Sequence, residues 1–233
     1  MAPRPPLRAV TFDVTGTLVV PRDLGGEYAR VLARHGVAIA PERLAGLVPE
    51  VWRELACAAE PSRDRFAAHP GGAPGFWRQA LERVCARADA PAPSRFAAAE
   101  LYERFAQPGA WRPLADLPEL LDALAARGIA TGVVANWDER LPRLLARFGL
   151  AGRLRAIVTS QEIGVEKPHP AIFAAALARL GTRAAETLHV GDRQLEDVEG
   201  AEAAGLSALR VDPAGGGDLV SVAELPARLE ALG

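Results

Sequence analysis

Carboxylates, hydroxyls and one lysine follow four short apolar runs of the chain, and these residue types suit chemistry on a phosphate group. Asp13 ends the first run and precedes Thr15 and Thr17. Five further polar groups follow later runs: Asn136, Asp138, Lys167, Asp192 and Asp197. Clustered carboxylate oxygens suit a hard cation such as Mg²⁺, which takes one or two protein carboxylates together with phosphate oxygens and water. A lysine ammonium beside them suits a phosphate.

Short apolar runs alternate with helical periodicity from about residue 111 onward. The runs predict strands at 8–14, 129–135, 156–159, 187–190 and 207–211. The periodic segments predict helices at 117–127, 141–148, 170–180, 198–204 and 222–232. This alternation is typical of an α/β fold, a doubly wound parallel sheet with helices on both faces. Ligands bind outside the carboxyl ends of such strands, so we expect the polar groups to converge on one crevice.

Residues 25–107 differ from the rest, because their apolar positions recur at spacings of three and four that favour amphipathic helices. A segment rich in glycine and proline, 69–75, interrupts them and predicts a loop. The sequence therefore predicts two parts. Residues 1–18 and 110–233 form the α/β core domain, and residues 19–109 form an α-helical cap inserted after the first strand.

The composition is that of an ordinary globular domain. The 233 residues carry a net charge of -2, so neither a nucleic-acid partner nor a membrane surface is expected. No apolar run approaches the roughly 18 residues of a membrane helix, and residues 1–8 lack a secretory apolar region, which favours a cytoplasmic protein. Cys57 and Cys85 form no CxxC motif, so we expect buried free thiols. We expect His189 to be a hydrogen-bonded residue of the core.

Four segments resemble the motifs of the haloacid dehalogenase-like (HAD) superfamily. Phe12-Asp13-Val14-Thr15-Gly16-Thr17-Leu18 resembles its first motif, a hydrophobic strand followed by DxDGTL. Val133-Val134-Ala135-Asn136 is similar to the second, Lys167-Pro168 to the third, and the GDxxxxD pattern of 191–197 to the fourth. Each motif alone is weak, but all occur in order across almost the whole chain. The cap position resembles the phosphoglycolate phosphatase and 2-haloacid dehalogenase branch.

The resemblance implies a Mg²⁺-dependent phosphatase acting on a small phosphorylated metabolite. Asp13 would attack phosphorus and form an aspartyl phosphate. The metal would lie between Asp13, the backbone carbonyl of Thr15, Asp192 and the phosphate. Three further roles are implied: Asp197 would bind the metal directly or through water, Lys167 would offset charge between Asp13 and the phosphate, and Thr17 and Asn136 would position phosphate oxygens.

Two positions depart from the family pattern. Thr15 stands where the family has a second Asp, the residue that protonates the leaving group and later activates water. Loss of a general acid/base typically costs about 10²–10⁴ in rate, so we expect slow turnover or a preference for good leaving groups. Ala135 stands where Ser or Thr usually donates to the phosphate, unless Asn136 substitutes. Asp23 and Glu27 are candidate replacements for the missing acid.

Two other functions stay open at this point. A dehalogenase would use Asp13 on carbon without a metal, but that branch has Tyr at the position of Thr15, and the GDxxxxD pattern also disfavours it. A catalytically weakened binding or regulatory module is the other alternative, suggested by Thr15 and Ala135. The sequence sets neither the substrate's identity nor the oligomeric state.

Overall fold

The computed structural model describes residues 5–57 and 62–230 and divides the chain into two compact units. One unit comprises Met1–Val20 and Pro113–Gly233, and the other comprises Pro21–Arg112. The first contains the parallel sheet and the residues of the four motif-like segments, whereas the candidate acids Asp23 and Glu27 lie in the second. The second is helical, and its role as a cap that closes over the site stays a prediction.

A five-stranded parallel sheet forms the centre of the α/β unit, with the strand order β5-β4-β1-β6-β7. This is the doubly wound arrangement expected from the alternating pattern, because the chain adds β4 and β5 on one side of β1 and then crosses to add β6 and β7 on the other. The strands are β1 (Ala9–Phe12), β4 (Ala130–Ala135), β5 (Ala156–Thr159), β6 (Thr187–Gly191) and β7 (Ser207–Arg210). A separate two-stranded sheet contains β2 (Val19–Pro21) and β3 (Trp111–Pro113).

The register of the central strands brings their carboxyl ends to the same edge. Phe12 of β1 lies beside Val133 of β4 and Val190 of β6. All four residues of β1 and all five of β6 are buried, as expected for strands covered on both faces. The residues that follow β1, β4 and β6 therefore emerge side by side, and Asp13, Asn136 and Asp192 are among them.

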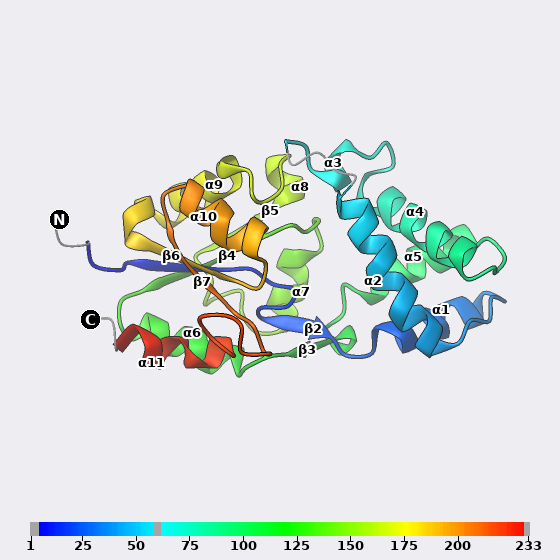
Figure 1. Ribbon diagram of the computed structural model, residues 1–233, viewed down its shortest axis with the longest axis horizontal. Coiled ribbons are helices and arrows are strands. Elements are labelled where there is room, and N and C mark those ends of the chain that lie inside the picture. Colours follow the sequence, from blue (N-terminus) through cyan, green and yellow to red (C-terminus); the bar gives the residue numbers. More distant parts are fainter. Residues whose placement is uncertain (1–4, 58–61, 231–233) are drawn as a thin grey trace. The chain divides into compact units, whose positions relative to one another are not determined.

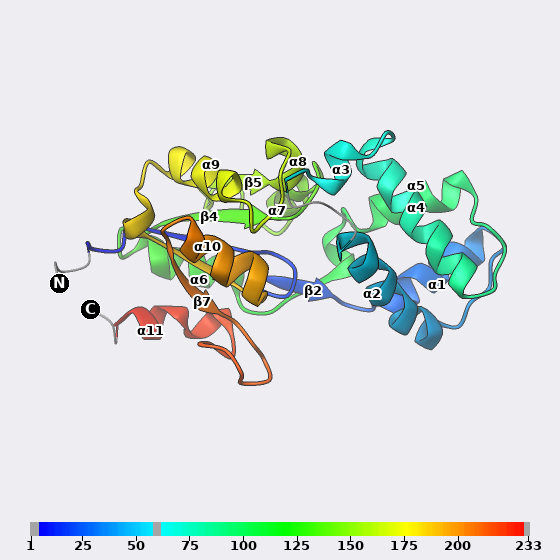
Figure 2. The same ribbon diagram turned by 45° about the horizontal axis from the view of Figure 1, so that its top comes forward.

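Helices cover both faces of the sheet (Figure 1). Helices α9 and α10 lie on one face, and α6 and α11 lie on the other, an arrangement that the turned view repeats (Figure 2). Ile172 and Phe173 of α9 pack with Val134 and Val158 of the sheet in one apolar cluster. The helices of this unit are α6 (Leu117–Ala125), α7 (Leu141–Arg147), α8 (Ser160–Ile163), α9 (Pro170–Leu180), α10 (Gly200–Ala203) and α11 (Leu225–Glu230).

The segment after β6 differs from the helix predicted at 198–204. A π-helix over Gln194–Glu199 precedes α10. The N–H of Val198 donates to the carbonyl of Arg193, five residues back, at 3.3 Å. Within this wider turn Asp197 points inward and its side chain is only 1% exposed. The periodicity of the sequence did not predict this turn. Its polar residues belong to the site, and a π-helix does not repeat every 3.6 residues.

The helical unit contains α1 (Leu24–Arg34), α2 (Pro41–Cys57), α3 (Arg65–Ala68), α4 (Gly72–Arg87) and α5 (Arg95–Arg104). Aromatic rings form much of its core: the Trp52 and Trp77 centroids lie 4.8 Å apart, and Phe105 packs 5.6 Å from Trp111. The prediction of a loop through residue 75 was wrong, because α4 begins at Gly72. A Cβ on Gly75 would lie 2.7 Å from the His69 ring, so the small residue there permits close packing rather than a break.

Two further expectations concern burial. Cys85 is a buried free thiol whose pKa burial raises to about 11, as expected for a residue of the helical core. The side chain of Cys57 lies outside the described residues. Within residues 5–57 and 62–230, no helix combines the length and the apolar character required to cross a membrane.

Glu27 and Asp23, the candidate replacement acids, are both held by contacts inside the helical unit. Asp23 caps α1 by accepting from the N–H of Gly26 at 2.9 Å and also pairs with Arg30. Glu27 is buried and accepts from the Nε and Nη2 groups of Arg104, each at 2.6 Å. Hydrogen bonds from Arg104 lower the pKa of Glu27, which disfavours a role as proton donor near neutral pH.

The Glu27–Arg104 pair is expected to stabilise the helical unit. Replacing Arg104 with Met leaves the buried Glu27 carboxylate short of its main partner, and we expect the free energy of unfolding to fall by about 2 kcal/mol, allowing for the partial exposure of Arg104. Chemical denaturation at pH 7 measures this. Because the folded-state pKa of Glu27 is lowered, the stabilisation is present above its unfolded value of 4.5 and is lost as the pH falls through the folded value.

Arg78→Met is the matched control, because Arg78 pairs with Glu82 on the exposed surface of α4. That exposed pair is worth less than about 1 kcal/mol. Equal losses in the two variants would contradict a structural role for the buried pair.

Candidate active site

The first turn of the site lies directly after β1. The Asp13 N–H donates to the carbonyl of Val190 at 2.9 Å, which fixes the start of this turn against β6. Gly16 has φ of +98°, and a Cβ there would lie 2.4 Å from the Asp192 carboxylate. The turn therefore passes so close to Asp192 that only glycine fits, and this places the loops after β1 and β6 together.

Three carboxylates and one ammonium meet at this edge of the sheet. Asp13, Asp192 and Asp197 each place an oxygen within 4.8 Å of the others. Lys167 Nζ donates to Asp13 Oδ1 and to Asp197 Oδ1, each at 2.6 Å, and its side chain is 1% exposed. The sheet topology thus assembles residues from three separate segments.

The charges in this cluster do not balance within the described chain. Burial, then the nearby Asp13 and Asp197 carboxylates, raises the pKa of Asp192 to about 7. Burial also raises the pKa of Asp13, against the opposing effect of the Lys167 ammonium. The Lys167 ammonium pairs with Asp13 and Asp197, and Arg193 lowers the pKa of Asp192 less than burial and the other carboxylates raise it, so a further positive charge would stabilise the ionised forms. This all-oxygen donor set fits a hard divalent cation such as Mg²⁺.

Asp197 differs from the other two carboxylates because its oxygens already have several donors. Oδ1 accepts from Lys167 and lies 3.3 Å from His189 Nε2, and Oδ2 accepts from the N–H of Arg193 at 2.9 Å. Burial would raise the pKa of Asp197, but Lys167 and His189 lower it below its usual value. Asp197 therefore holds the Lys167 ammonium in place.

Lys167 keeps a donor for a substrate. An ammonium has three N–H groups, and the contacts of Lys167 with Asp13 and Asp197 use two of them. Although burial would lower the pKa of Lys167, the two carboxylates raise it, so the side chain is charged. Binding of an anionic oxygen by the remaining N–H stays a prediction.

Both the oxygen and the nitrogen of the Asn136 amide contact the backbone of Lys167. Its Oδ1 accepts from the Lys167 N–H at 2.7 Å, and its Nδ2 donates to the Lys167 carbonyl at 3.2 Å. The sequence assigned Asn136 to phosphate oxygens, whereas the observed contacts fix the backbone of Lys167. The amide retains one N–H, so its contact with a phosphate oxygen stays a prediction. Thr17 is buried, and its hydroxyl donates to Asp192 Oδ1 at 3.4 Å.

Thr15 lies at the exposed rim of the cluster and has a partner that the sequence did not suggest. The indole N–H of Trp137 donates to Thr15 Oγ1 at 3.0 Å. Because the threonine oxygen accepts this bond, its own proton is left to be donated elsewhere. Trp137 thus orients the hydroxyl that stands where the family pattern has its second Asp.

Thr11 and His189 extend the cluster into the core. Thr11 Oγ1 lies 2.9 Å from His189 Nδ1, and both residues are completely buried. The sequence placed His189 in the core, but its contact with Asp197 was missed. The available signal was a polar residue inside each of two apolar strands, Thr11 in β1 and His189 in β6.

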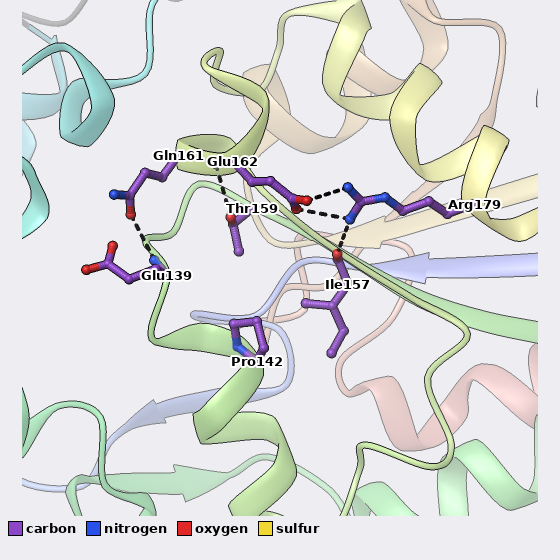
Figure 3. A pocket seen from close by; sticks show the side chains of 7 residues that line it. All are labelled: Glu139, Pro142, Ile157, Thr159, Gln161, Glu162 and Arg179. Atoms are coloured by element: carbon purple, nitrogen blue, oxygen red, sulfur yellow. Dashed lines mark hydrogen bonds and ion pairs between the residues drawn. The ribbon is translucent and has the colours of Figure 1, made fainter.

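A surface recess of about 600 Å³ lies along the edge strand β5 and shares no residue with this cluster (Figure 3). Arg179 donates to the Ile157 carbonyl at 2.6 Å and pairs with Glu162. The Arg179 guanidinium therefore covers part of the open backbone edge of β5, and its charge is matched by Glu162. The recess therefore lies at a sheet edge that these contacts protect.

Comparisons with known proteins agree with the fold. The haloacid dehalogenase-like hydrolase family matches residues 7–205. Haloacid dehalogenase-like hydrolase domain-containing protein 3 of Danio rerio is 31% identical over 97% of this chain and 98% of its own. Glyceraldehyde 3-phosphate phosphatase of Methanopyrus kandleri is also 31% identical, over 88% of this chain and 84% of its own.

A solved structure shares the same fold at lower identity. The HAD-hydrolase YfnB from Bacillus subtilis, solved with magnesium, superposes with a TM-score of 0.76 at 17% identity, covering 97% of this chain and 100% of that chain. On the strength of the family match over residues 7–205 and the full-length relative, this chain belongs to the haloacid dehalogenase-like hydrolase family.

Proposed function

We propose that this chain is a Mg²⁺-dependent phosphatase that acts on a small phosphorylated metabolite, with Asp13 as its nucleophile. The observation that supports this most is the Lys167 ammonium held 2.6 Å from Asp13, with Asp192 completing the acidic cluster. Two relatives named as phosphatases support the reaction class, glyceraldehyde 3-phosphate phosphatase and ribulose-1,5-bisphosphate 5-phosphatase.

In the first step an oxygen of Asp13 forms a bond to phosphorus while the bond from phosphorus to the ester oxygen breaks. The leaving oxygen takes a proton from solvent water, and an aspartyl phosphate remains. In the second step a water oxygen bonds to this phosphorus while the bond from phosphorus to the Asp13 oxygen breaks. The proton of the attacking water passes to solvent, inorganic phosphate is released, and the Asp13 carboxylate is restored. Splitting the reaction in this way replaces one difficult displacement by two easier ones.

The other residues place and neutralise charge during both steps. Asp13, Asp192 and the Thr15 carbonyl would hold Mg²⁺, with Asp197 acting through water and through Lys167, and the ion would offset negative charge on the phosphate. The remaining N–H of Lys167 donates to a phosphate oxygen beside Asp13. Asn136 fixes the backbone that presents this lysine. Phosphoryl transfer depends chiefly on such positioning and charge neutralisation.

Thr15 explains why we propose slow turnover. A threonine hydroxyl does not ionise near neutral pH, so it neither gives up a full proton to the leaving group nor activates water as a carboxylate does. The Trp137 N–H fixes its oxygen at 3.0 Å, and the hydroxyl can still donate a hydrogen bond. The protein should therefore favour leaving groups that depart without protonation.

Replacing Thr15 with Asp should raise turnover of an alkyl phosphate by about 10²-fold, because it restores a group that can donate and accept a proton. Thr15→Asn is the matched control, because it has the size of Asp without the acid. Steady-state release of inorganic phosphate from the two variants and the parent measures the effect. An increase in Thr15→Asn equal to that in Thr15→Asp would mean that side-chain size, not acid–base chemistry, limits the rate.

The direct test of the proposed function is hydrolysis of an aryl phosphate with Mg²⁺ and with a chelator. We expect turnover only with Mg²⁺, and we expect Mg²⁺ alone to raise the melting temperature of the parent, because a ligand that binds only the folded state stabilises it. Asp192→Asn should lose most of this thermal shift. Turnover that is unaffected by the chelator would contradict the metal-dependent mechanism.

A further inference from the structure

A buried polar chain runs from the core of the sheet to the nucleophile. It passes from Thr11 through His189, Asp197 and Lys167 to Asp13, with links of 2.9, 3.3, 2.6 and 2.6 Å. Apart from Asp13, each side chain in this chain of contacts is at most 1% exposed. The mechanism above uses Asp13, Lys167 and Asp197 and leaves Thr11 and His189 without a role.

The direction of each hydrogen bond follows from the partners of Asp197. Its Oδ1 accepts from the Lys167 ammonium and its Oδ2 accepts from the Arg193 N–H, so the carboxylate acts as an acceptor at both oxygens. The nearest nitrogen of His189, Nε2, must then supply the proton of their contact. The two buried groups otherwise present lone pairs to each other, which is costly where water is excluded.

Thr11 fixes the other ring nitrogen. Its hydroxyl has one proton and two possible acceptors, His189 Nδ1 at 2.9 Å and the Leu188 carbonyl at 3.4 Å. The shorter distance favours donation to the imidazole. If Nδ1 accepts the Thr11 proton, the ring is neutral with its hydrogen on Nε2. The His189 ring also packs almost perpendicular to the Phe173 ring, with centroids 5.2 Å apart, which limits its rotation.

We propose that His189 is a positioning residue that acts through Asp197, its neutral Nε2–H tautomer being selected by Thr11. The imidazole holds the Asp197 carboxylate so that Lys167 contacts Asp197 and Asp13 at once and presents its third N–H to the substrate. This role rests on the proposed phosphatase function for its catalytic consequence. The hydrogen-bond arrangement itself does not depend on that function.

Nitrogen-15 NMR of the parent protein at neutral pH tests the tautomer directly. The chain has four histidines, and the spectrum of His189→Gln identifies the signal of His189 by its disappearance. We expect a protonated Nε2 and an unprotonated Nδ1. Thr11→Val should add the Nδ1–H form to the spectrum, whereas Thr11→Ser should not. A doubly protonated ring, or a dominant Nδ1–H form in the parent, would overturn the proposal.

Kinetics separates positioning from a purely structural role. We expect His189→Leu to lower kcat for an aryl phosphate by about 10–100-fold with little change in KM, as is usual when support for an active-site ligand is removed. His189→Gln retains an N–H at similar reach and should restore most of kcat. A folded His189→Leu protein with the parent's kcat would overturn the proposal. If the parent lacks Asp13-dependent turnover, the proposed function fails, and the NMR result still decides the hydrogen-bond arrangement.

Discussion

Replacing Asp13 with Asn is expected to lower kcat/KM for an aryl phosphate by at least about 10⁴-fold, because the amide cannot form the aspartyl phosphate. The substitution keeps the size and the hydrogen-bonding reach of the side chain, so the fold should survive. Removing a partly uncompensated buried charge should even leave the protein as stable as the parent. Inorganic phosphate release measured with saturating Mg²⁺ gives the rate.

Asp122→Asn is the matched control for this prediction. Asp122 lies in the same unit, but its side chain is 58% exposed and pairs with Arg153 on the surface. The same chemical change there should leave the rate at the parent's value, since exposed ion pairs contribute little. Comparable rates for Asp13→Asn and Asp122→Asn would exclude Asp13 as the nucleophile.

Replacing Lys167 with Met should damage both activity and stability. The methionine keeps the length of the side chain, but Asp13 and Asp197 lose the ammonium that lies 2.6 Å from each. Leaving buried charges without their partner typically costs 3–5 kcal/mol, so we expect a loss of about 3 kcal/mol in the free energy of unfolding. Turnover should fall by about 10³-fold, because a donor to the phosphate and a positioned charge are lost together.

Denaturant unfolding of Lys167→Met, of Asp197→Asn and of the double variant identifies the cause of the lost stability. The double variant should be more stable than the sum of the single effects predicts, because one of the unpaired carboxylates is gone. The stability of Lys167→Met should also rise as the pH is lowered from 7 to 5. The remaining buried carboxylates then take up protons in the folded state more readily than in the unfolded state. Additive effects in the double variant would contradict a coupled cluster.

The strands of the sheet were accessible from the sequence because each is a short apolar run that ends at a polar residue. The segments Ala156–Thr159 and Pro170–Leu180 have the bounds that the pattern predicted. Once the strands are parallel and doubly wound, topology alone brings Asp13, Lys167 and Asp192 together. The acidic cluster could therefore be predicted without any knowledge of distances.

Side-chain partners were harder to predict because they depend on register and on local turns. The contacts of the Asn136 amide with the backbone of Lys167, 31 positions along the chain, were not predicted. The contact of Trp137 with Thr15 joins residues 122 positions apart, and no local pattern encodes it. The π-helix that turns Asp197 inward likewise has no periodic signature of its own.

The Thr15 departure from the family pattern has a physical consequence under the proposed mechanism. In that mechanism Lys167 and the acidic cluster would support formation of an aspartyl phosphate, whereas Thr15 would lack the acid–base group that its hydrolysis needs. A cluster built in this way should make the intermediate faster than it breaks it down. The phosphorylated protein should consequently accumulate during turnover.

Mass spectrometry of protein quenched with acid during turnover of an aryl phosphate with Mg²⁺ tests the central claim most directly. We predict a phosphorylated form whose modification maps to Asp13 and which is absent from Asp13→Asn and from samples with chelator. Rapid, Mg²⁺-dependent phosphate release by the parent and by Asp13→Asn alike, with no phosphate trapped on Asp13, would contradict it.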